Sequence, residues 1–121
     1  MALVLIVDDS PTEVHVLRQY LENNGYETEA AEDGSEGVNK ARTLKPDLVL
    51  MDIVMPGMNG FQATRELARD PDTARIPVLM VTTKGDETDR IWGMRQGATD
   101  YIVKPVTESQ LVDKVRSVLE N

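Results

Sequence analysis

The sequence has no cysteine, and its only histidine is His15. Without cysteine the chain can form neither a disulfide bond nor a zinc–thiolate site, and it lacks a thiol nucleophile. One histidine cannot build a multi-histidine metal site. The apolar runs are about as long as a strand and far too short to span a bilayer, so we expect no membrane insertion. Because Met1-Ala2 leads directly into a β-rich run, we expect no signal peptide and a cytoplasmic location.

Positive charge is also in short supply, since 13 Lys and Arg stand against 21 Asp and Glu, giving a net charge of −8. Nucleic acids and anionic membranes need a basic footprint, so this balance argues against both as partners. A length of 121 residues is typical of one domain with a substantial core. We therefore predict a single domain over residues 1–121, with no room for an output domain.

Short apolar runs alternate with helical patterns along the chain. Strands are predicted at Leu3–Val7, Tyr26–Ala30, Leu48–Met51, Val78–Val81 and Tyr101–Val103. Helices are predicted from Pro11 after the Ser10 cap, from Asp33 to about Leu44, from Phe61 to about Arg69, around Glu87 to Gln96, and after Thr107. Five such units indicate an α/β fold, a doubly wound five-stranded parallel sheet. The strand order 2-1-3-4-5 suits five strands and places the alternating second strand at an edge.

The first helix carries a strong start signal. Ser10 stands at the N-cap, Pro11 at the first helical position, and Glu13 at the position where a capping box has its acidic member.

Polar side chains follow the central strands where each strand ends. Asp8 and Asp9 follow the first strand, Asp52 the third, Thr82 closes the fourth, and Lys104 follows the fifth. Sites in open parallel sheets lie beyond these carboxyl ends, so we expect the three carboxylates to converge. Clustered carboxylates repel one another unless a cation lies among them, and Mg²⁺ is the natural oxygen-liganded cation.

Each of these residues also has an ordinary structural explanation. Asp8 and Asp9 could simply cap the first helix, Thr82 could fill a strand, and Lys104 could be a solvated surface side chain. Ser10 already offers the cap, however, and Asp52 reaches the same place independently. The joint arrangement therefore favours a functional site.

The complete set of motifs resembles bacterial two-component response-regulator receiver domains of the chemotaxis CheY type, with their (βα)5 fold. The motifs are Leu5-Ile6-Val7-Asp8-Asp9, Met51-Asp52 with Met55-Pro56-Gly57 and Gly60, Val81-Thr82, and Tyr101 with Lys104-Pro105. Other segments are most similar to the stand-alone regulators of type IV pilus twitching motility; these are Asp9 to Glu13, Asp52 to Pro56, Gly60 to Arg65, Ile91 to Gly93 and Arg95 to Ala98.

The resemblance implies a role for each site residue. Asp52 would accept a phosphoryl group from a phosphohistidine on a sensor histidine kinase. Mg²⁺ would be bound directly by Asp9 and Asp52, through water by Asp8, and by the backbone carbonyl of Val54. Lys104 and Thr82 would contact the phosphoryl group. Such a protein catalyses only its own phosphotransfer and autodephosphorylation, and the Lys104–Pro105 peptide should be cis.

The resemblance also implies an output by protein–protein contact. Movement of Thr82 would let the Tyr101 ring move inward and repack the surface of the fourth helix, fifth strand and fifth helix, where a downstream protein docks. Tyr101 could instead be a plain strand aromatic, and Trp92 could belong to the core or to a partner surface. Val54 lies two residues after the phosphoacceptor Asp52, and Lys84 lies two residues after Thr82; both would tune the lifetime of the phosphoryl group.

Two other classes of protein share this architecture. An Asp-nucleophile phosphatase of the haloacid-dehalogenase type needs two Asp residues two positions apart at the end of the first strand, whereas Asp8 and Asp9 are adjacent. A flavodoxin-like cofactor binder needs a Ser/Thr-rich phosphate loop after that strand, and none is evident here. The receiver interpretation is therefore favoured.

Overall fold

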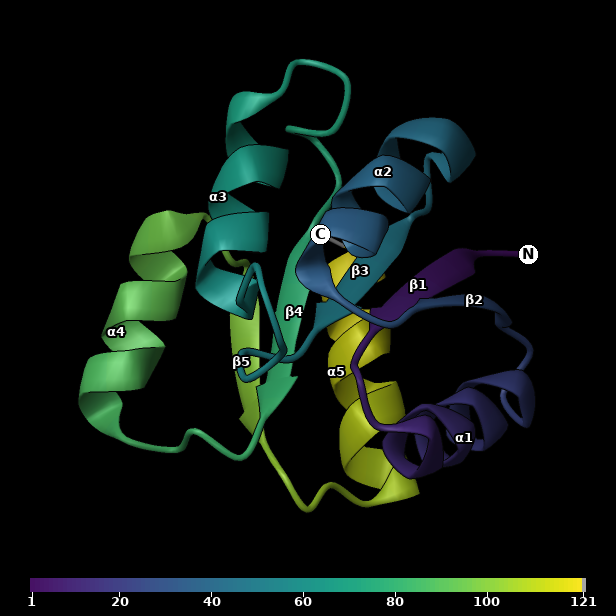
Figure 1. Ribbon diagram of the computed structural model, residues 1–121. Helices are drawn as coiled ribbons and strands as arrows, with labels where there is room; N and C mark the ends of the chain where they lie inside the picture. The colour runs from purple at the N-terminus through teal and green to yellow at the C-terminus, as the bar shows by residue number, and fades with distance from the viewer. Residues whose placement is uncertain (121) are drawn as a thin grey trace.

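The computed structural model describes residues 1–120, in which five strands alternate with five helices (Figure 1). The strands are β1 (Leu3–Val7), β2 (Glu27–Ala31), β3 (Leu48–Met51), β4 (Val78–Thr82) and β5 (Asp100–Val103). The helices are α1 (Pro11–Glu22), α2 (Gly34–Leu44), α3 (Gly60–Arg69), α4 (Glu87–Gln96) and α5 (Glu108–Glu120). Every predicted strand and helix is present, and several ends differ from the prediction by one residue.

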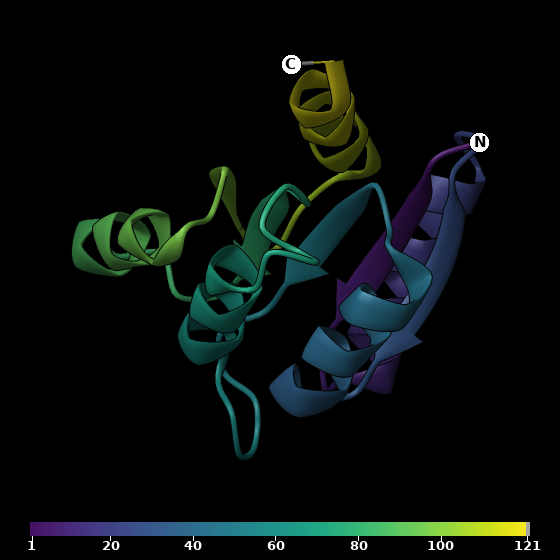
Figure 2. The same ribbon diagram turned by 90° about the horizontal axis from the view of Figure 1, so that it is seen from above.

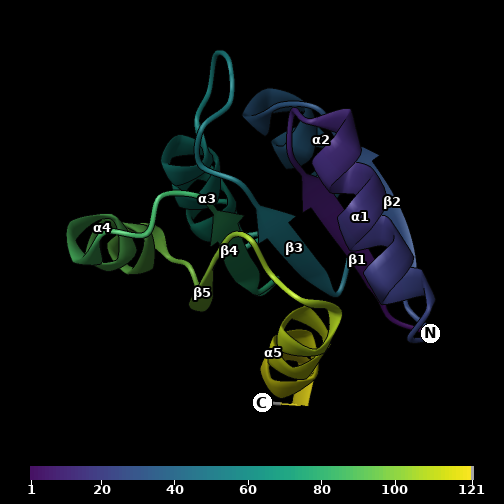
Figure 3. The same ribbon diagram turned by 90° about the horizontal axis from the view of Figure 1, so that it is seen from below.

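The five strands form one parallel sheet in the order β2-β1-β3-β4-β5, which confirms the predicted topology. Helices α2, α3 and α4 cover one face of the sheet, and α1 and α5 cover the other (Figures 2 and 3). Val7 of β1 is paired with Met51 of β3, so the residues that follow them leave the sheet level with each other. The backbone N–H of Asp52 extends this pairing by donating to the Val7 carbonyl at 3.0 Å. The register therefore brings Asp8 and Asp52 to one edge of the sheet.

The central strands are apolar throughout because helices cover both of their faces. Alternate residues enter two cores. Under α2, α3 and α4 the sheet contributes Leu5, Val7, Val49, Met51, Val78 and Met80. Under α1 and α5 it contributes Val4, Ile6, Leu48, Leu50, Leu79 and Val81. Burying a side chain of this size stabilises the fold by about 1.5–3 kcal/mol, so these strands hold the sheet edge rigidly.

The helix starts agree with the sequence signals at α5 and in part at α1. Thr107 and Gln110 form a reciprocal pair, with Thr107 N donating to Gln110 Oε1 at 3.0 Å and Gln110 N to Thr107 Oγ1 at 3.2 Å. The Ser10 hydroxyl accepts a hydrogen bond from Glu13 N at 3.3 Å, but the second bond of a capping box, from Ser10 N to the Glu13 carboxylate, is replaced. Ser10 N donates instead to Asp8 Oδ1 at 2.9 Å, which leaves the Glu13 carboxylate free to face the site.

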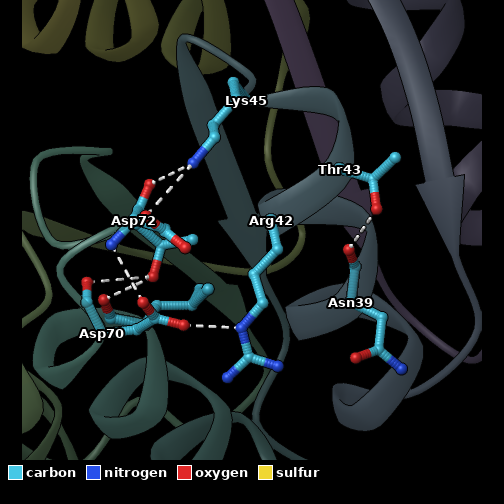
Figure 4. Close-up of polar contacts among 8 residues, drawn as sticks. Asn39, Arg42, Thr43, Lys45, Asp70 and Asp72 are labelled. Atoms are coloured by element: carbon cyan, nitrogen blue, oxygen red, sulfur yellow. Dashed lines mark hydrogen bonds and ion pairs between the residues drawn. The ribbon is translucent and has the colours of Figure 1, made fainter.

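Away from that edge, the end of α2 is tied to the segment that follows α3 (Figure 4). Arg42 Nε donates to Asp70 Oδ2 at 2.5 Å, and Lys45 Nζ donates to the Asp72 carbonyl at 2.9 Å. The hydrogen bond from Arg42 lowers the pKa of Asp70 below its ordinary value. Asp70 is also the C-cap of α3, so this residue both ends the helix and anchors α2. No helix within residues 1–120 is long and apolar enough to cross a membrane.

Candidate functional site

Three carboxylates meet beyond the carboxyl ends of β1 and β3. Asp8, Asp9 and Asp52 each offer an oxygen, and these oxygens lie within 4.8 Å of one another. Asp8 is 3% exposed, whereas Asp9 is exposed and forms no hydrogen bond or ion pair with the other residues among 1–120. Ile53 N donates to Asp52 Oδ1 at 2.8 Å and fixes that carboxylate. The predicted convergence of these three residues is present.

Lys104 reaches the same cluster from the end of β5. Its Nζ lies 2.7 Å from Asp8 Oδ2 and 3.6 Å from Asp52 Oδ2. The side chain is only 7% exposed, so it is not a solvated surface lysine. Lys104 N donates to the Thr82 carbonyl at 2.8 Å, and the Lys104–Pro105 peptide is cis as expected. A buried cation thus lies between the carboxylates of β1 and β3.

Glu13 is a member of this cluster that sequence reasoning missed. Its Oε2 lies 3.7 Å from Lys104 Nζ. The motif at the start of α1 explained Glu13 completely as a capping residue, so nothing local pointed to Lys104, which is remote in sequence. Only the position of β5 reveals that the two side chains meet.

The titration of Asp52 and Lys104 reflects this mixture of burial and charge. Burial raises the pKa of Asp52 above its ordinary value, while the charge of Lys104 and the Thr82 hydroxyl lower it in part. Burial acts to lower the pKa of Lys104, but its hydrogen bond to Asp8 and the nearby carboxylate charges outweigh burial and raise it. Lys104 therefore stays charged, and it partly offsets the cost of an ionised Asp52.

The cluster fits a hard divalent cation on the chemistry of its donors. All three groups are carboxylates, the ligand type that Mg²⁺ takes together with water molecules. Asp9 has an unpaired carboxylate, and the Asp52 carboxylate accepts Ile53 N through Oδ1. Val54 follows in the exposed loop after β3, and the part predicted for its carbonyl stays a prediction.

Thr82 and Tyr101 are both buried, and both bond to the backbone of Lys84. Thr82 Oγ1 accepts from Lys84 N at 3.3 Å, and the Tyr101 hydroxyl donates to the Lys84 carbonyl. The Arg90 guanidinium carbon lies 5.5 Å from the centre of the Tyr101 ring. Burial raises the pKa of the Tyr101 hydroxyl to about 12. One residue of the β4–α4 loop thus connects the two predicted switch residues, a link that the sequence did not indicate.

Gly60 is a second feature that sequence reasoning did not explain. A Cβ at this first residue of α3 would lie 2.0 Å from the backbone oxygen of Asp52. The Gly60 N–H donates to the Ile53 carbonyl at 2.9 Å. The absence of a side chain therefore lets the start of α3 press against the backbone that holds Asp52.

Comparison with known proteins places this geometry among signalling proteins. Residues 4–116 match the sequence model of the response regulator receiver domain. The chain is 58% identical to protein PilH of Pseudomonas aeruginosa, over 98% of each chain. It is 40% identical to the DNA-binding response regulator MtrA of Mycolicibacterium smegmatis over 96% of this chain, but it spans only 50% of that relative.

Solved structures agree with these sequence matches. The chemotaxis protein CheY4 of Vibrio cholerae superposes with a TM-score of 0.92 at 34% identity, over 98% of each chain. A putative response regulator from Chloroflexus aurantiacus superposes with a TM-score of 0.95 at 33% identity, over 99% of this chain and 98% of that one. Both similarities cover the sheet edge where the carboxylates and Lys104 lie.

Proposed function

This chain belongs to the response regulator receiver domain family, and from that premise we propose that Asp52 accepts a phosphoryl group from a sensor histidine kinase. The observation that carries the proposal is the buried cluster of Asp8, Asp52 and Lys104, with Asp9 beside it. Among the three carboxylates, only that of Asp52 is both held by a backbone N–H and partly buried. The Lys104 ammonium lies near it, at 3.6 Å, but outside hydrogen-bond distance. Asp8 is already hydrogen-bonded to Lys104.

In the proposed transfer, an ionised Asp52 oxygen attacks the phosphorus of a phosphohistidine. A P–O bond forms, the P–N bond breaks, and the imidazole nitrogen leaves with the electron pair. The product is an acyl phosphate on Asp52. Lys104 favours this step because its charge lies 3.6 Å from Asp52 Oδ2, where it can stabilise the added negative oxygens. The cluster positions the reacting groups and neutralises their charge.

Asp9 and Asp52 are the residues that would hold Mg²⁺ directly, with Asp8 acting through water and the Val54 carbonyl as a further ligand. When bound, the cation would supply positive charge against the phosphoryl oxygens. The protein's own contribution is to keep Asp9 unpaired and exposed while Lys104 occupies the buried side of the cluster. Beyond its own phosphorylation and autodephosphorylation, we propose no enzymatic activity.

The output would use the connection between the site and β5. A phosphoryl group adds about −1.5 to −2 charge next to Thr82. If Thr82 turns toward it, the hydroxyl leaves Lys84 N, and the loop that also holds the Tyr101 hydroxyl is released from one of its contacts. We place the resulting docking of a downstream protein on the α4, β5 and α5 face. Similarity to PilH supports a role in type IV pilus twitching motility, in the cytoplasm.

The Asp-nucleophile phosphatase is not favoured. Asp8 would be its nucleophile, but Asp8 is hydrogen-bonded to Lys104 Nζ at 2.7 Å and is nearly inaccessible. A phosphatase would turn over p-nitrophenyl phosphate repeatedly, whereas we expect a receiver to release no more p-nitrophenol than a buffer blank.

Phosphotransfer from purified, radiolabelled histidine kinases tests the proposed function. We expect label to move from a cognate kinase to the wild-type protein and not to Asp52→Asn. Asp100→Asn is the matched control, because Asp100 is an Asp at the opposite end of β5 from Lys104, paired with Lys114. It should be labelled like the wild type. Equal labelling of Asp52→Asn would overturn the proposal.

A further inference from the structure

Helix α4 exposes three large apolar side chains that the phosphorylation site does not use. Ile91 and Trp92 are each 46% exposed and Met94 is 42% exposed. Most of the protein's other large apolar side chains are buried in the two cores. Leaving three such side chains in water on one short helix loses the stabilisation that burial would give. Exposed apolar side chains of this kind direct attention to the surroundings of each one as a place where a partner could bind.

Trp92 also lines a groove between α3 and α4, two helices that lie side by side on the same face of the sheet (Figure 2). The groove has a volume of about 410 Å³. Arg65 and Arg69 enter it from α3, and Arg95 enters it from α4. Gly97 and Ala68 also line it and lie close together, because a Cβ at Gly97 would lie 2.8 Å from the Ala68 Cβ. The groove therefore lies where α3 and the end of α4 approach each other closely.

The charge of this groove is opposite to that of the whole protein. No acidic residue lines it, although the chain carries 21 Asp and Glu and a net charge of −8. Within residues 1–120, Arg65, Arg69 and Arg95 form no ion pair, whereas every lysine except Lys84 does. Three unpaired guanidinium groups and one half-exposed indole ring therefore line the same groove.

Helix dipoles explain only part of this arrangement. Arg69 and Arg95 lie in the last turns of α3 and α4, where positive charge is favourable. Arg65 lies in the middle of α3 and gains nothing from this effect, and an exposed Trp92 gains nothing either. Arginine and tryptophan are the residues most enriched where proteins bind one another tightly.

We propose that the α3–α4 groove, defined by Arg65, Arg69, Trp92 and Arg95, binds an acidic peptide segment of a partner protein, with an apolar side chain packed on Trp92. Carboxylates of the segment would pair with the arginines. A groove that combines arginines with an apolar ring suits a peptide with both acidic and apolar side chains better than a compact ligand such as a nucleotide. The groove is separate from the pocket between α4, β5 and α5, which is lined by Arg90, Tyr101 and Lys114.

Trp92 is the only tryptophan in the chain, so its fluorescence reports directly on this groove. The probe is a short synthetic peptide with alternating Glu and Leu residues, titrated into the protein. We expect a saturable change in Trp92 emission that weakens as salt is added, because screening reduces the attraction between exposed charges. Arg65→Gln and Arg69→Gln should each weaken binding by up to about fivefold, the upper end of the range of exposed ion pairs.

Arg75→Gln is the matched control, because Arg75 is an exposed arginine that also lacks an ion pair within residues 1–120 but does not line the groove. It removes the same charge and should leave peptide affinity unchanged. The proposal is overturned if the Glu/Leu peptide gives no saturable signal, or if Arg75→Gln weakens binding as much as Arg65→Gln. It is also overturned if a Lys/Leu peptide or ATP binds as well as the Glu/Leu peptide.

Discussion

Replacing Lys104 by Met should destabilise the fold strongly when no divalent cation is present. The side chains of Lys104 and Asp8 are 7% and 2% exposed, and their charged atoms lie 2.7 Å apart. Removing one partner of such a buried pair leaves the other charge uncompensated and costs about 3–5 kcal/mol. Domains of this size are stable by only about 5–15 kcal/mol, so the loss should be plain in a urea unfolding curve measured in EDTA.

Lys114→Met is the matched control for this experiment. Lys114 forms an ion pair with Asp100 at 3.0 Å, but both side chains are 38% exposed. An exposed pair contributes about 0–1 kcal/mol, so this variant should unfold close to the wild type. If Lys104→Met loses no more stability than Lys114→Met, then the buried pair does not hold the site as the geometry indicates.

The same Lys104→Met variant should bind Mg²⁺ more tightly than the wild type. The ammonium group repels a divalent cation at the carboxylates, and relief of about 1.4 kcal/mol of that repulsion strengthens binding tenfold. Saturating Mg²⁺ should therefore restore much of the lost stability, because a ligand bound only by the folded state stabilises it. Isothermal titration calorimetry measures the affinity, and equal or weaker binding by the variant would contradict this account.

Three further predictions follow from other residues of the site. Gly60→Ala should lower the free energy of unfolding by about 3 kcal/mol or more, because its Cβ would lie 2.0 Å from the Asp52 backbone oxygen. Gly57→Ala has open space around its Cβ but a φ of +71°, so it should cost about 1–2 kcal/mol. Urea unfolding of the two variants compares these losses. Val54→Asn should speed phosphoryl loss, because an amide can orient water and Val cannot; slower decay of label from the variant would refute this. The pKa of the Tyr101 hydroxyl is raised to about 12, so the stability that this shift adds is complete below pH about 10. That contribution to the free energy of unfolding should be lost as the pH rises from about 10 to about 12. Urea unfolding of Tyr101→Phe should not show this part of the decline.

The sheet and most of the site could be predicted from the sequence, because each depends on a local signal. A central strand covered on both faces must be apolar, so the runs at Leu48–Met51 and Val78–Val81 are readily seen. Parallel strands align their carboxyl ends, so the residues after them must meet. That rule alone brings Asp8, Asp52 and Lys104 together.

The features that were missed depend on contacts between distant segments. The capping motif accounted for Glu13 without any contact to Lys104. The Glu13 carboxylate does not accept a hydrogen bond from Ser10 N, because Ser10 N donates to the Asp8 carboxylate instead. The link from Thr82 to Tyr101 runs through the backbone of Lys84, which no side-chain pattern encodes. The α3–α4 groove arises where Gly97 approaches Ala68, a distance that neither helix specifies alone.

Identification of the phosphorylated residue tests the central claim most directly. The protein is phosphorylated by its kinase or by acetyl phosphate, and borohydride then reduces the acyl phosphate of an aspartate to homoserine. Tandem mass spectrometry of the peptides locates the change. We predict homoserine at position 52 and unchanged aspartate at positions 8 and 9. Homoserine at position 8 or 9 in place of 52, or a phosphoryl group retained on His15, would contradict the account.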